Sequence, residues 1–274
     1  MAEEEQSVGE DRATQLSVTA TAAPETIEEP PVEIHKPKPW HNWREFLKEY
    51  AIIVLGVATA LAAEQIAEKL HDRAKAAEAR ASIRAEISRN LGTMDWRDAT
   101  EACMAKRLDE TDGLIADLAA GRLPQEALWI GTPIGNGMDT GRYETGVQSG
   151  ATSLFGSEEQ AAYASLYANF KTYQESIVRE HLAWADMRSL EKHPSPSAAL
   201  DVMLRGAVQA ARINRWGIQA SRLVAIRVAA GMGIAPAKMG RLKMPDACVP
   251  LHTTREAALK LLMQPDEWNL EPPK

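Results

Sequence analysis

Two cysteines, Cys103 and Cys248, are the residues of this 274-residue chain whose chemistry depends most on their surroundings. In a reducing compartment they would be two unrelated thiols. In an oxidising compartment they become a candidate disulfide between an expected helix and a C-terminal loop. Closing so long a loop is worth on the order of 4–5 kcal/mol in the chain-entropy treatment, as an upper figure. The disulfide is therefore expected only if this part of the chain is exported.

Other residue types that could perform chemistry occur without a recognised spacing. The six histidines lack zinc-type spacing, and the chain has no CxxC or HExxH. His181 lies on an apolar helical face, where we interpret it as a satisfied core or boundary histidine rather than a ligand. Glycines between 131 and 141 match neither a phosphate-binding loop nor a dinucleotide fingerprint, and no GxSxG occurs. The sequence thus predicts no catalytic, metal-binding or cofactor-binding residues and no cofactor, although dispersed catalytic residues remain an alternative.

The charge of the chain is concentrated at its beginning. The formal net charge is −7, but nine acidic side chains and one basic one precede residue 35, which leaves the rest near neutral. Residues 1–39 combine these acids with several prolines, which predicts a disordered acidic tail. No basic stripe with interleaved aromatic residues occurs, so we expect no nucleic-acid partner.

The composition favours helices as the elements that position these residues. Aromatic residues make up 5% of the chain, alanine is abundant, and no series of strands is apparent. We predict an all-α fold. The expected helices cover residues 45–91, 94–120, 138–149, 157–190, a segment after the SPS sequence ending near Gly231, and 254–263. The first is expected to stop before Gly92, and the SEEQ sequence at 157–160 has the form of a capping box with Ser157 and Gln160 as partners.

Two of these helices carry clear apolar stripes. At three- and four-residue steps, the stripe of the second expected helix holds Met104, Leu108, Thr111, Ile115 and Leu118. The stripe of the 157–190 helix holds Tyr163, Tyr167, Phe170, Ile177, His181 and Trp184. No pair of acids stands out as buried.

The first expected helix contains an uncharged apolar run from Tyr50 to Ala63, which is short for a membrane span of ~20 residues. Its flanks extend it, because Phe46 to Ile66 is apolar apart from a few residues whose charged ends can reach the interface. The candidate interface anchors are Trp40, Trp43, Lys48, Tyr50 and Glu64. Gly56 and Ala60 form a small-xxx-small pair, so a homodimer through this helix is a possible association.

Three segments resemble a family of uncharacterised, single-pass bacterial membrane proteins. The first is WHNWREFLKEYAIIVLGVATALAAEQ (40–65), and the second is YETGVQSGATSLFGSEEQAAYASLY (143–167). The third is the pair of cysteine-containing segments EACMAKRLDE and DACVPL. The resemblance implies an inner-membrane anchor and a helical periplasmic domain, with no known activity, cofactor or catalytic residues. Ala58 and Thr59 make the span less hydrophobic than is typical of that family.

The expected organisation follows from these observations. Residues 1–39 form the tail, 40–66 the interfacial segment and transmembrane helix, 67–264 a helical stalk and bundle, and 265–274 a polar tail. Basic residues flank the run almost equally, so the cytoplasmic N-terminus and periplasmic bundle rest on the resemblance and the cysteine pair. The expected partners are the lipid bilayer and an unknown protein, and the expected role is a scaffold or sensor-like interaction module. The alternatives are a membrane-tethered enzyme and a soluble helical protein in which residues 50–63 are buried.

Overall fold

The computed structural model describes residues 43–122, 125–135, 137–239 and 244–263. The described chain is all-α, as predicted, and no strand occurs in these ranges. The expected tails at 1–39 and 265–274, and the candidate anchor Trp40, lie outside the described residues. The chain divides into two units, Met1–Ala58 and Thr59–Lys274, which are described separately below.

The first helix, α1, is a continuous α-helix from Trp43 to Ala99. The prediction that it stops at Leu91 was wrong, because Gly92 serves packing and does not end the helix. A Cβ atom at Gly92 would lie 2.5 Å from the carbonyl oxygen of Ala237. The Ala237 amide donates to the Ser88 carbonyl at 2.8 Å, so the 234–239 segment lies directly against α1. Residues 94–99, expected in the second helix, therefore belong to α1.

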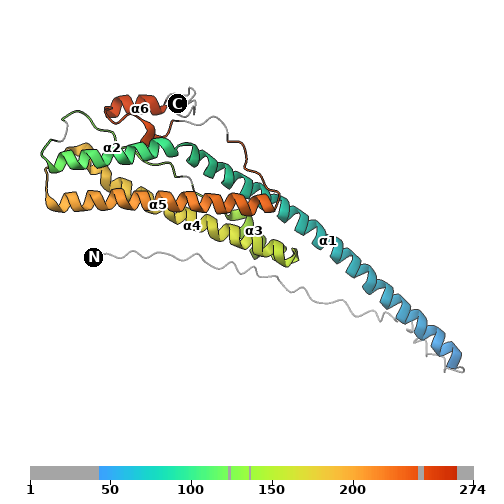
Figure 1. Cartoon of the computed structure of the whole chain (residues 1–274). Coiled ribbons are helices and arrows are strands. Elements are labelled where there is room, and N and C mark those ends of the chain that lie inside the picture. Colours follow the sequence, from blue (N-terminus) through green and yellow to red (C-terminus); the bar gives the residue numbers. More distant parts are fainter. Residues whose placement is uncertain (1–42, 123–124, 136, 240–243, 264–274) are drawn as a thin grey trace, which may run out of the picture. The chain divides into compact units, whose positions relative to one another are not determined.

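The remaining helices all belong to the unit Thr59–Lys274. They are α2 (Glu101–Ala119), α3 (Gly141–Gln148), α4 (Ser157–Met187), α5 (Ala198–Gly231) and α6 (Arg255–Met263). Of these, α4 and α5 pack against the second half of α1. Short 3₁₀ turns lie at Ala151–Leu154, Arg188–Lys192 and Asp246–Cys248. Figure 1 shows α2, α4 and α5 running alongside one another. Except at the α1–α2 junction, these helices fall close to the predicted ranges.

The core lies between these helices in two main clusters, and both predicted stripes contribute to it. Met104, Leu108, Ile115 and Leu118 are buried with Trp184 and Met187 around α2. Ile83, Ile87 and Leu91 of α1 are buried with Tyr163, Tyr167 and Phe170 of α4. Burial of one face of each helix is the main source of helix stability here, because isolated helices are marginal in water.

The N-termini of α5 and α4 are capped in different ways. Ser197 caps α5, its side-chain oxygen accepting a hydrogen bond from the Leu200 amide at 3.2 Å. The capping box predicted at α4 was wrong: Gly156 is the N-cap, without a side-chain hydrogen bond. Gln160 instead donates from Nε2 to the Phe155 carbonyl at 2.9 Å, which holds the preceding turn rather than the cap amide.

Candidate functional site

The apolar run of α1 lies on a fully exposed stretch of helix. Every residue from 50 to 63 is exposed. An 18-residue window of this helix has a mean hydropathy of 1.7, and none of the window is buried. A helix of this length and composition can cross a membrane, and a buried core helix or a signal sequence can share these properties. In the alternative of a soluble helical protein, residues 50–63 were expected to be buried, whereas in the structure they are exposed.

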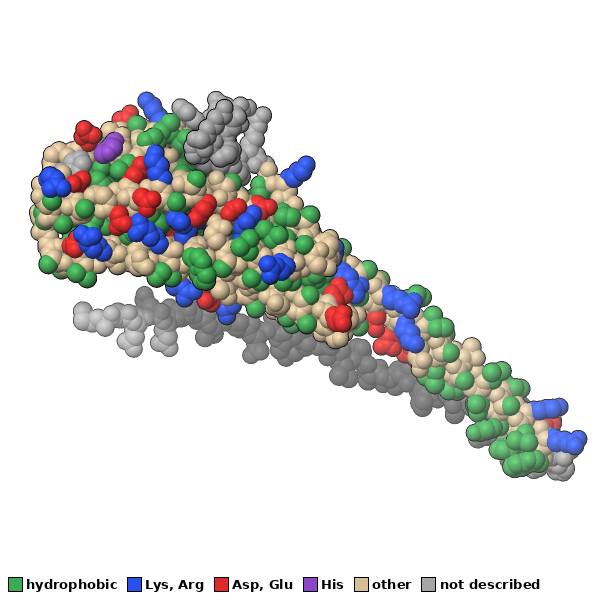
Figure 2. Space-filling view, in the orientation of Figure 1, with side chains coloured by type: hydrophobic (Ala, Val, Ile, Leu, Met, Phe, Trp, Pro, Cys, Tyr) green, Lys and Arg blue, Asp and Glu red, His purple; other side chains and the backbone are tan. Residues whose placement is uncertain are grey.

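Aromatic and basic side chains precede this run on the first turns of α1. The ring centroids of Trp43 and Phe46 are 5.5 Å apart, and those of Phe46 and Tyr50 are 6.0 Å apart. Arg44 and Lys48 are exposed between them. Figure 2 shows apolar side chains on the outside of these first turns. Rings with basic neighbours at the end of an apolar run suit a lipid headgroup region.

The other sequence-predicted residues of α1 are also exposed. Gly56, Ala60 and Glu64 are all accessible. A Cβ atom added at Gly56 would have nothing within 4 Å. The small face at Gly56 and Ala60 is therefore open to contact by another molecule.

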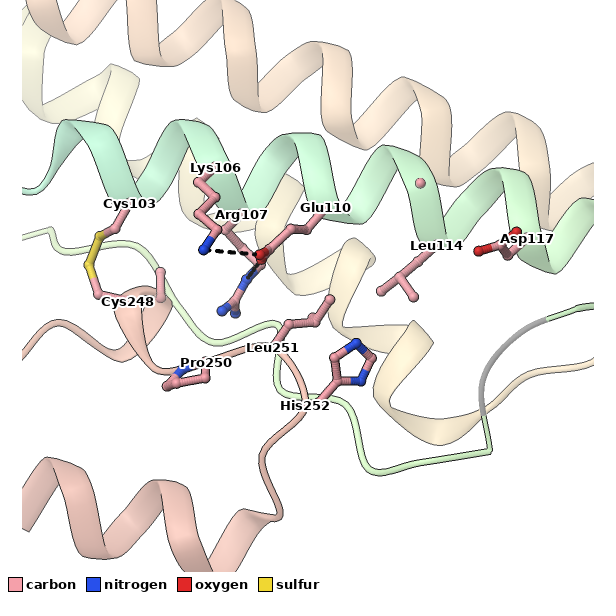
Figure 3. Close-up of a pocket in the computed structure, with 12 residues that line it drawn as sticks. Cys103, Lys106, Arg107, Glu110, Leu114, Asp117, Cys248, Pro250, Leu251 and His252 are labelled. Carbon is pink, nitrogen blue, oxygen red and sulfur yellow. Dashed lines mark hydrogen bonds and ion pairs between the residues drawn. A yellow bond between two sulfur atoms is a disulfide. The ribbon is translucent and has the colours of Figure 1, made fainter. Parts of the chain in front are cut away.

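The second candidate site is the disulfide that joins Cys103 of α2 to Cys248 in the Asp246–Cys248 turn. Their Cα atoms are 5.3 Å apart, within the ordinary range for a disulfide. The structure thus brings together the two cysteines that the sequence singled out for an exported domain. The link fixes the C-terminal segment on the outer side of α2 (Figure 3).

Arg107 lies beside the disulfide, one helical turn after Cys103, and is almost entirely buried. Its guanidinium donates to the carbonyls of Trp129, Ile130 and Val249. Its Nε lies 2.9 Å from Glu110 Oε2. Burial lowers the pKa of Arg107, and the ion pair with Glu110 opposes that shift. One side chain therefore ties two loop segments to α2.

Two carboxylates complete this junction. Asp246 accepts a hydrogen bond from Trp129 Nε1 at 2.7 Å and another from the Thr132 hydroxyl. Glu191 accepts one from the Ile130 amide at 2.9 Å. The loop at 129–132 is thus held by Asp246 on one side and by Glu191 on the other, and both carboxylates are used to fix the loop.

A half-open pocket of about 590 Å³ lies between α2 and the 247–252 segment (Figure 3). Its charged side chains are already paired: Lys106 Nζ lies 3.7 Å from Glu110, and Asp117 lies 3.1 Å from Arg122. His252 stands at its rim, 3.6 Å from Glu126. The charged side chains around this pocket therefore have partners within the domain.

Besides Arg107, the core contains three buried charged side chains that were not predicted from the sequence, Glu86, Arg97 and Glu180. Arg97 and Glu180 form an ion pair of 2.7 Å, and Glu86 accepts a 2.6 Å hydrogen bond from the Tyr167 hydroxyl. Glu86 also accepts from the Arg142 amide at 2.7 Å, which caps α3 from α1. A signal was present, because Glu180 falls three residues after Ile177 and four before Trp184 on the same apolar stripe. Burial raises the pKa of the Glu180 carboxyl, and Arg97 opposes this shift.

His181 is half-buried, and its Nδ1 donates to the Ile177 carbonyl at 2.8 Å. Its ring packs against Gly135, where an added Cβ atom would approach within 2.1 Å of Cε1. Of the two roles expected for His181, core or boundary, its half-buried position corresponds to the boundary. In the described residues, no three His, Cys, Asp or Glu side chains come together in a group that could hold a metal ion.

Comparison of the chain with protein-family models, with curated proteins and with solved structures finds no match.

Proposed function

We propose that this protein is a single-pass membrane protein whose helical domain serves as an extracytoplasmic scaffold or sensor-like interaction module. The observation that carries the proposal is the exposed, uncharged run of α1 at residues 50–63. In water such a continuous apolar surface is unfavourable, at roughly 25 cal/mol per Å². A lipid bilayer removes that cost while α1 satisfies its own backbone hydrogen bonds.

The flanks of the run support a membrane boundary at its start. Trp43, Tyr50 and Lys48 lie within two turns of one another on exposed positions of α1. Amphipathic rings and a basic side chain that can snorkel are the residues found at membrane interfaces. Glu64 directly follows the uncharged run at its other end, where its carboxylate can be hydrated at the membrane interface.

The disulfide supports a periplasmic location for the helical domain. Cys103 and Cys248 both belong to the unit after residue 58, and disulfides persist in oxidising compartments. We therefore place the helical domain on the periplasmic side of a bacterial inner membrane and the residues before α1 in the cytoplasm. This orientation also agrees with the family that the sequence resembles.

The role as an interaction module rests on how the polar groups of the domain are used. Arg107, Asp246 and Glu191 hold loops, and Arg97 with Glu180 joins two helices. The pocket beside the disulfide has paired charges. Because these polar groups are used in contacts within the domain, we infer that the exposed surfaces of the domain bind a partner and that the domain holds no reactive centre.

Fractionation of cells expressing the full chain tests the anchor. We expect the protein in the membrane pellet after alkaline carbonate washing and in solution only with detergent. The double variant Ile53→Arg, Val57→Arg should move to the soluble fraction, since each central arginine costs roughly 2.5–3.5 kcal/mol of insertion. The matched variant Val178→Arg, Leu182→Arg alters exposed apolar positions on α4 and should stay in the membrane. Wild-type protein in the soluble fraction without detergent would overturn the proposal.

A further inference from the structure

The outward face of α5 carries a repeat that the helical domain does not use for its own packing. At alternating steps of four and three residues, the positions on this face are Val202, Gly206, Gln209, Ile213, Trp216, Ala220, Leu223 and Arg227. Val202 is 71% exposed, Ile213 58%, Trp216 74% and Leu223 60%. A spacing of 3.5 residues is that of a seam between two helices that coil around each other. These eight positions are called the α5 seam below.

The other faces of α5 already have partners within the domain. Arg215 pairs with Glu101 of α2 at 2.6 Å, and Arg222 pairs with Asp95 of α1 at 2.8 Å. On the side facing α4, Asn169 donates to the Ser221 carbonyl at 2.7 Å. Figure 2 shows acidic and basic side chains mixed over the near face of the domain, with apolar side chains grouped beside them. The α5 seam is the face that these contacts leave open.

We propose that two copies of this chain associate through the α5 seam as parallel, in-register helices. The parallel direction rests on the proposed membrane anchor. Contacts from Arg84 of α1 to the Met232 carbonyl and from Arg222 to Asp95 make α5 antiparallel to the second half of α1. An antiparallel α5 pair would point the two α1 helices in opposite directions, whereas two chains in one bilayer must enter it in the same direction.

The side chains of the seam fit this arrangement in size. In a parallel pair, Trp216 lies beside Trp216 of the second copy and packs against its Ile213 and Ala220, because side chains at equivalent heptad positions meet across such a seam. Ala220 leaves room for the indole, whereas Gly217 packs toward Ser176 of α4 within its own chain. Gln209 meets its own equivalent, where two amides can hydrogen-bond and fix the register.

The charges beside the seam do not oppose the pairing. Arg205 lies 2.9 Å from Asp201, and Arg212 lies 2.7 Å from Asp112, so both guanidinium groups have partners within their own chain. In a parallel pair, Arg205 would face Ala210 and Arg212 would face Gly217 of the second copy. Arg227 is the one charged position of the seam, and in a parallel pair it meets its own equivalent beyond Leu223, at an exposed end of the seam where both guanidinium groups can extend into solvent.

The size of the seam suits an association between anchored chains. Covering its apolar side chains would bury on the order of 500 Å² on each copy, and the roughly 1,000 Å² total is at the lower limit for a specific interface. Confinement to one bilayer raises the effective concentration of the two domains, which strengthens a contact of this modest size.

Cysteine cross-linking in membranes tests the direction and register. Cys103 and Cys248 are joined to each other, so an introduced cysteine supplies the reactive thiol. We expect Val202→Cys and Leu223→Cys, each alone, to give covalent dimers with an oxidant or a short bismaleimide. Lys171→Cys, an exposed position on α4, is the control and should give at least tenfold less dimer.

Each other cross-linking pattern overturns the proposal. In an antiparallel pair centred on the seam, two copies of residue 202 would be ~37 Å apart, given ~1.5 Å per residue. Cross-links would then form between Val202→Cys and Arg227→Cys chains but not within either variant alone. Cross-linking only at Gly56→Cys would place the contact in the proposed span, and no cross-linking would show that the domains stay apart.

A second substitution separates the seam from other contacts. Trp216→Asp should reduce Leu223→Cys cross-linking at least tenfold, whereas Leu182→Asp, at a 64% exposed position of α4, should leave it unchanged. Equal yields in the two variants would overturn the proposal. Fractionation of the same samples separates the two proposals, because a failed seam leaves uncross-linked protein in the membrane, whereas a failed anchor leaves protein in the soluble fraction.

Discussion

Arg97, near the end of α1, and Glu180, two turns before the end of α4, form a buried ion pair with Nη2 of Arg97 2.7 Å from one carboxylate oxygen and 3.0 Å from the other. The two side chains are 2% and 0% exposed. Glu101 contributes a second carboxylate, 3.5 Å from Arg97. This pair connects the two helices where the main core clusters meet.

Loss of one member of this pair should destabilise the domain strongly. Glu180→Ala leaves the Arg97 guanidinium buried without its main partner, which typically costs about 3–5 kcal/mol. Urea unfolding followed by circular dichroism gives the change in free energy. The matched control is Glu175→Ala, which removes an exposed pair with Arg179 and should cost less than about 1 kcal/mol. Equal losses in the two variants would contradict the assigned burial.

The disulfide should contribute stability only under oxidising conditions. The double variant Cys103→Ala, Cys248→Ala should lose about 2–5 kcal/mol of unfolding free energy, because the link closes a 145-residue separation. Reductant should weaken the wild-type protein by a similar amount and leave the variant unchanged. Mass spectrometry without reductant should find the two cysteine peptides linked, and two free thiols in the purified protein would rule out the disulfide.

The hydrogen bond between Tyr167 and Glu86 predicts sensitivity to alkali. Burial raises the pKa of the Tyr167 phenol above its ordinary value of 10.0, and Glu86 acts in the same direction. The unfolded phenol ionises near pH 10 while the folded one keeps its proton, so stability is fully present below pH 10 and is lost as the pH rises further.

The matched variant is Tyr167→Phe, which keeps the ring stacked on Tyr143 at 4.1 Å and removes the titrating group. Above pH 10, the unfolding free energy of the wild type should fall about 1.4 kcal/mol per pH unit more steeply than that of the variant. Tyr163 and Tyr173, whose phenol pKa values burial also raises, contribute equally to both proteins. Identical slopes in the two proteins would show that Tyr167 is not protected.

Gly92 should be intolerant of a side chain. Gly92→Ala places a methyl group 2.5 Å from the Ala237 carbonyl oxygen, which must move and so disturb the packing of the 234–239 segment against α1. We expect a loss of about 1–3 kcal/mol. The control is Gly113→Ala in α2, where nothing lies within 4 Å and alanine should be neutral or stabilise by up to about 1 kcal/mol. Thermal melts of both variants provide the comparison.

Elements with a strong period were predictable from the sequence, because their side chains must share one face. The stripes of α2 and α4 are examples. Gly92 was misread because a helix-ending glycine and a close-packing glycine look alike until the opposing Ala237 is placed. Gln160 was misread because its side-chain amide can reach either the cap amide or the Phe155 carbonyl, and in the structure it donates to Phe155.

The polar contacts of the candidate site depend on tertiary placement and were less predictable. Two cysteines allow only one intramolecular pairing, so Cys103 and Cys248 could be named in advance for an exported domain. Arg107 gives no such signal, because its partners at Trp129 and Val249 lie 22 and 142 residues away. Glu86 and Glu180 lie on apolar faces, a pattern from which burial could have been predicted, but not which cation or hydroxyl would meet them.

Alkaline phosphatase fused after residue 274 of the full chain tests the central claim most directly, with green fluorescent protein fused at the same place as the reciprocal reporter. Alkaline phosphatase is active only after export, and green fluorescent protein exported in unfolded form does not fluoresce. A membrane-anchored protein with a periplasmic helical domain predicts high phosphatase activity and no fluorescence. A well-expressed but inactive phosphatase fusion together with a fluorescent reciprocal fusion would contradict that orientation.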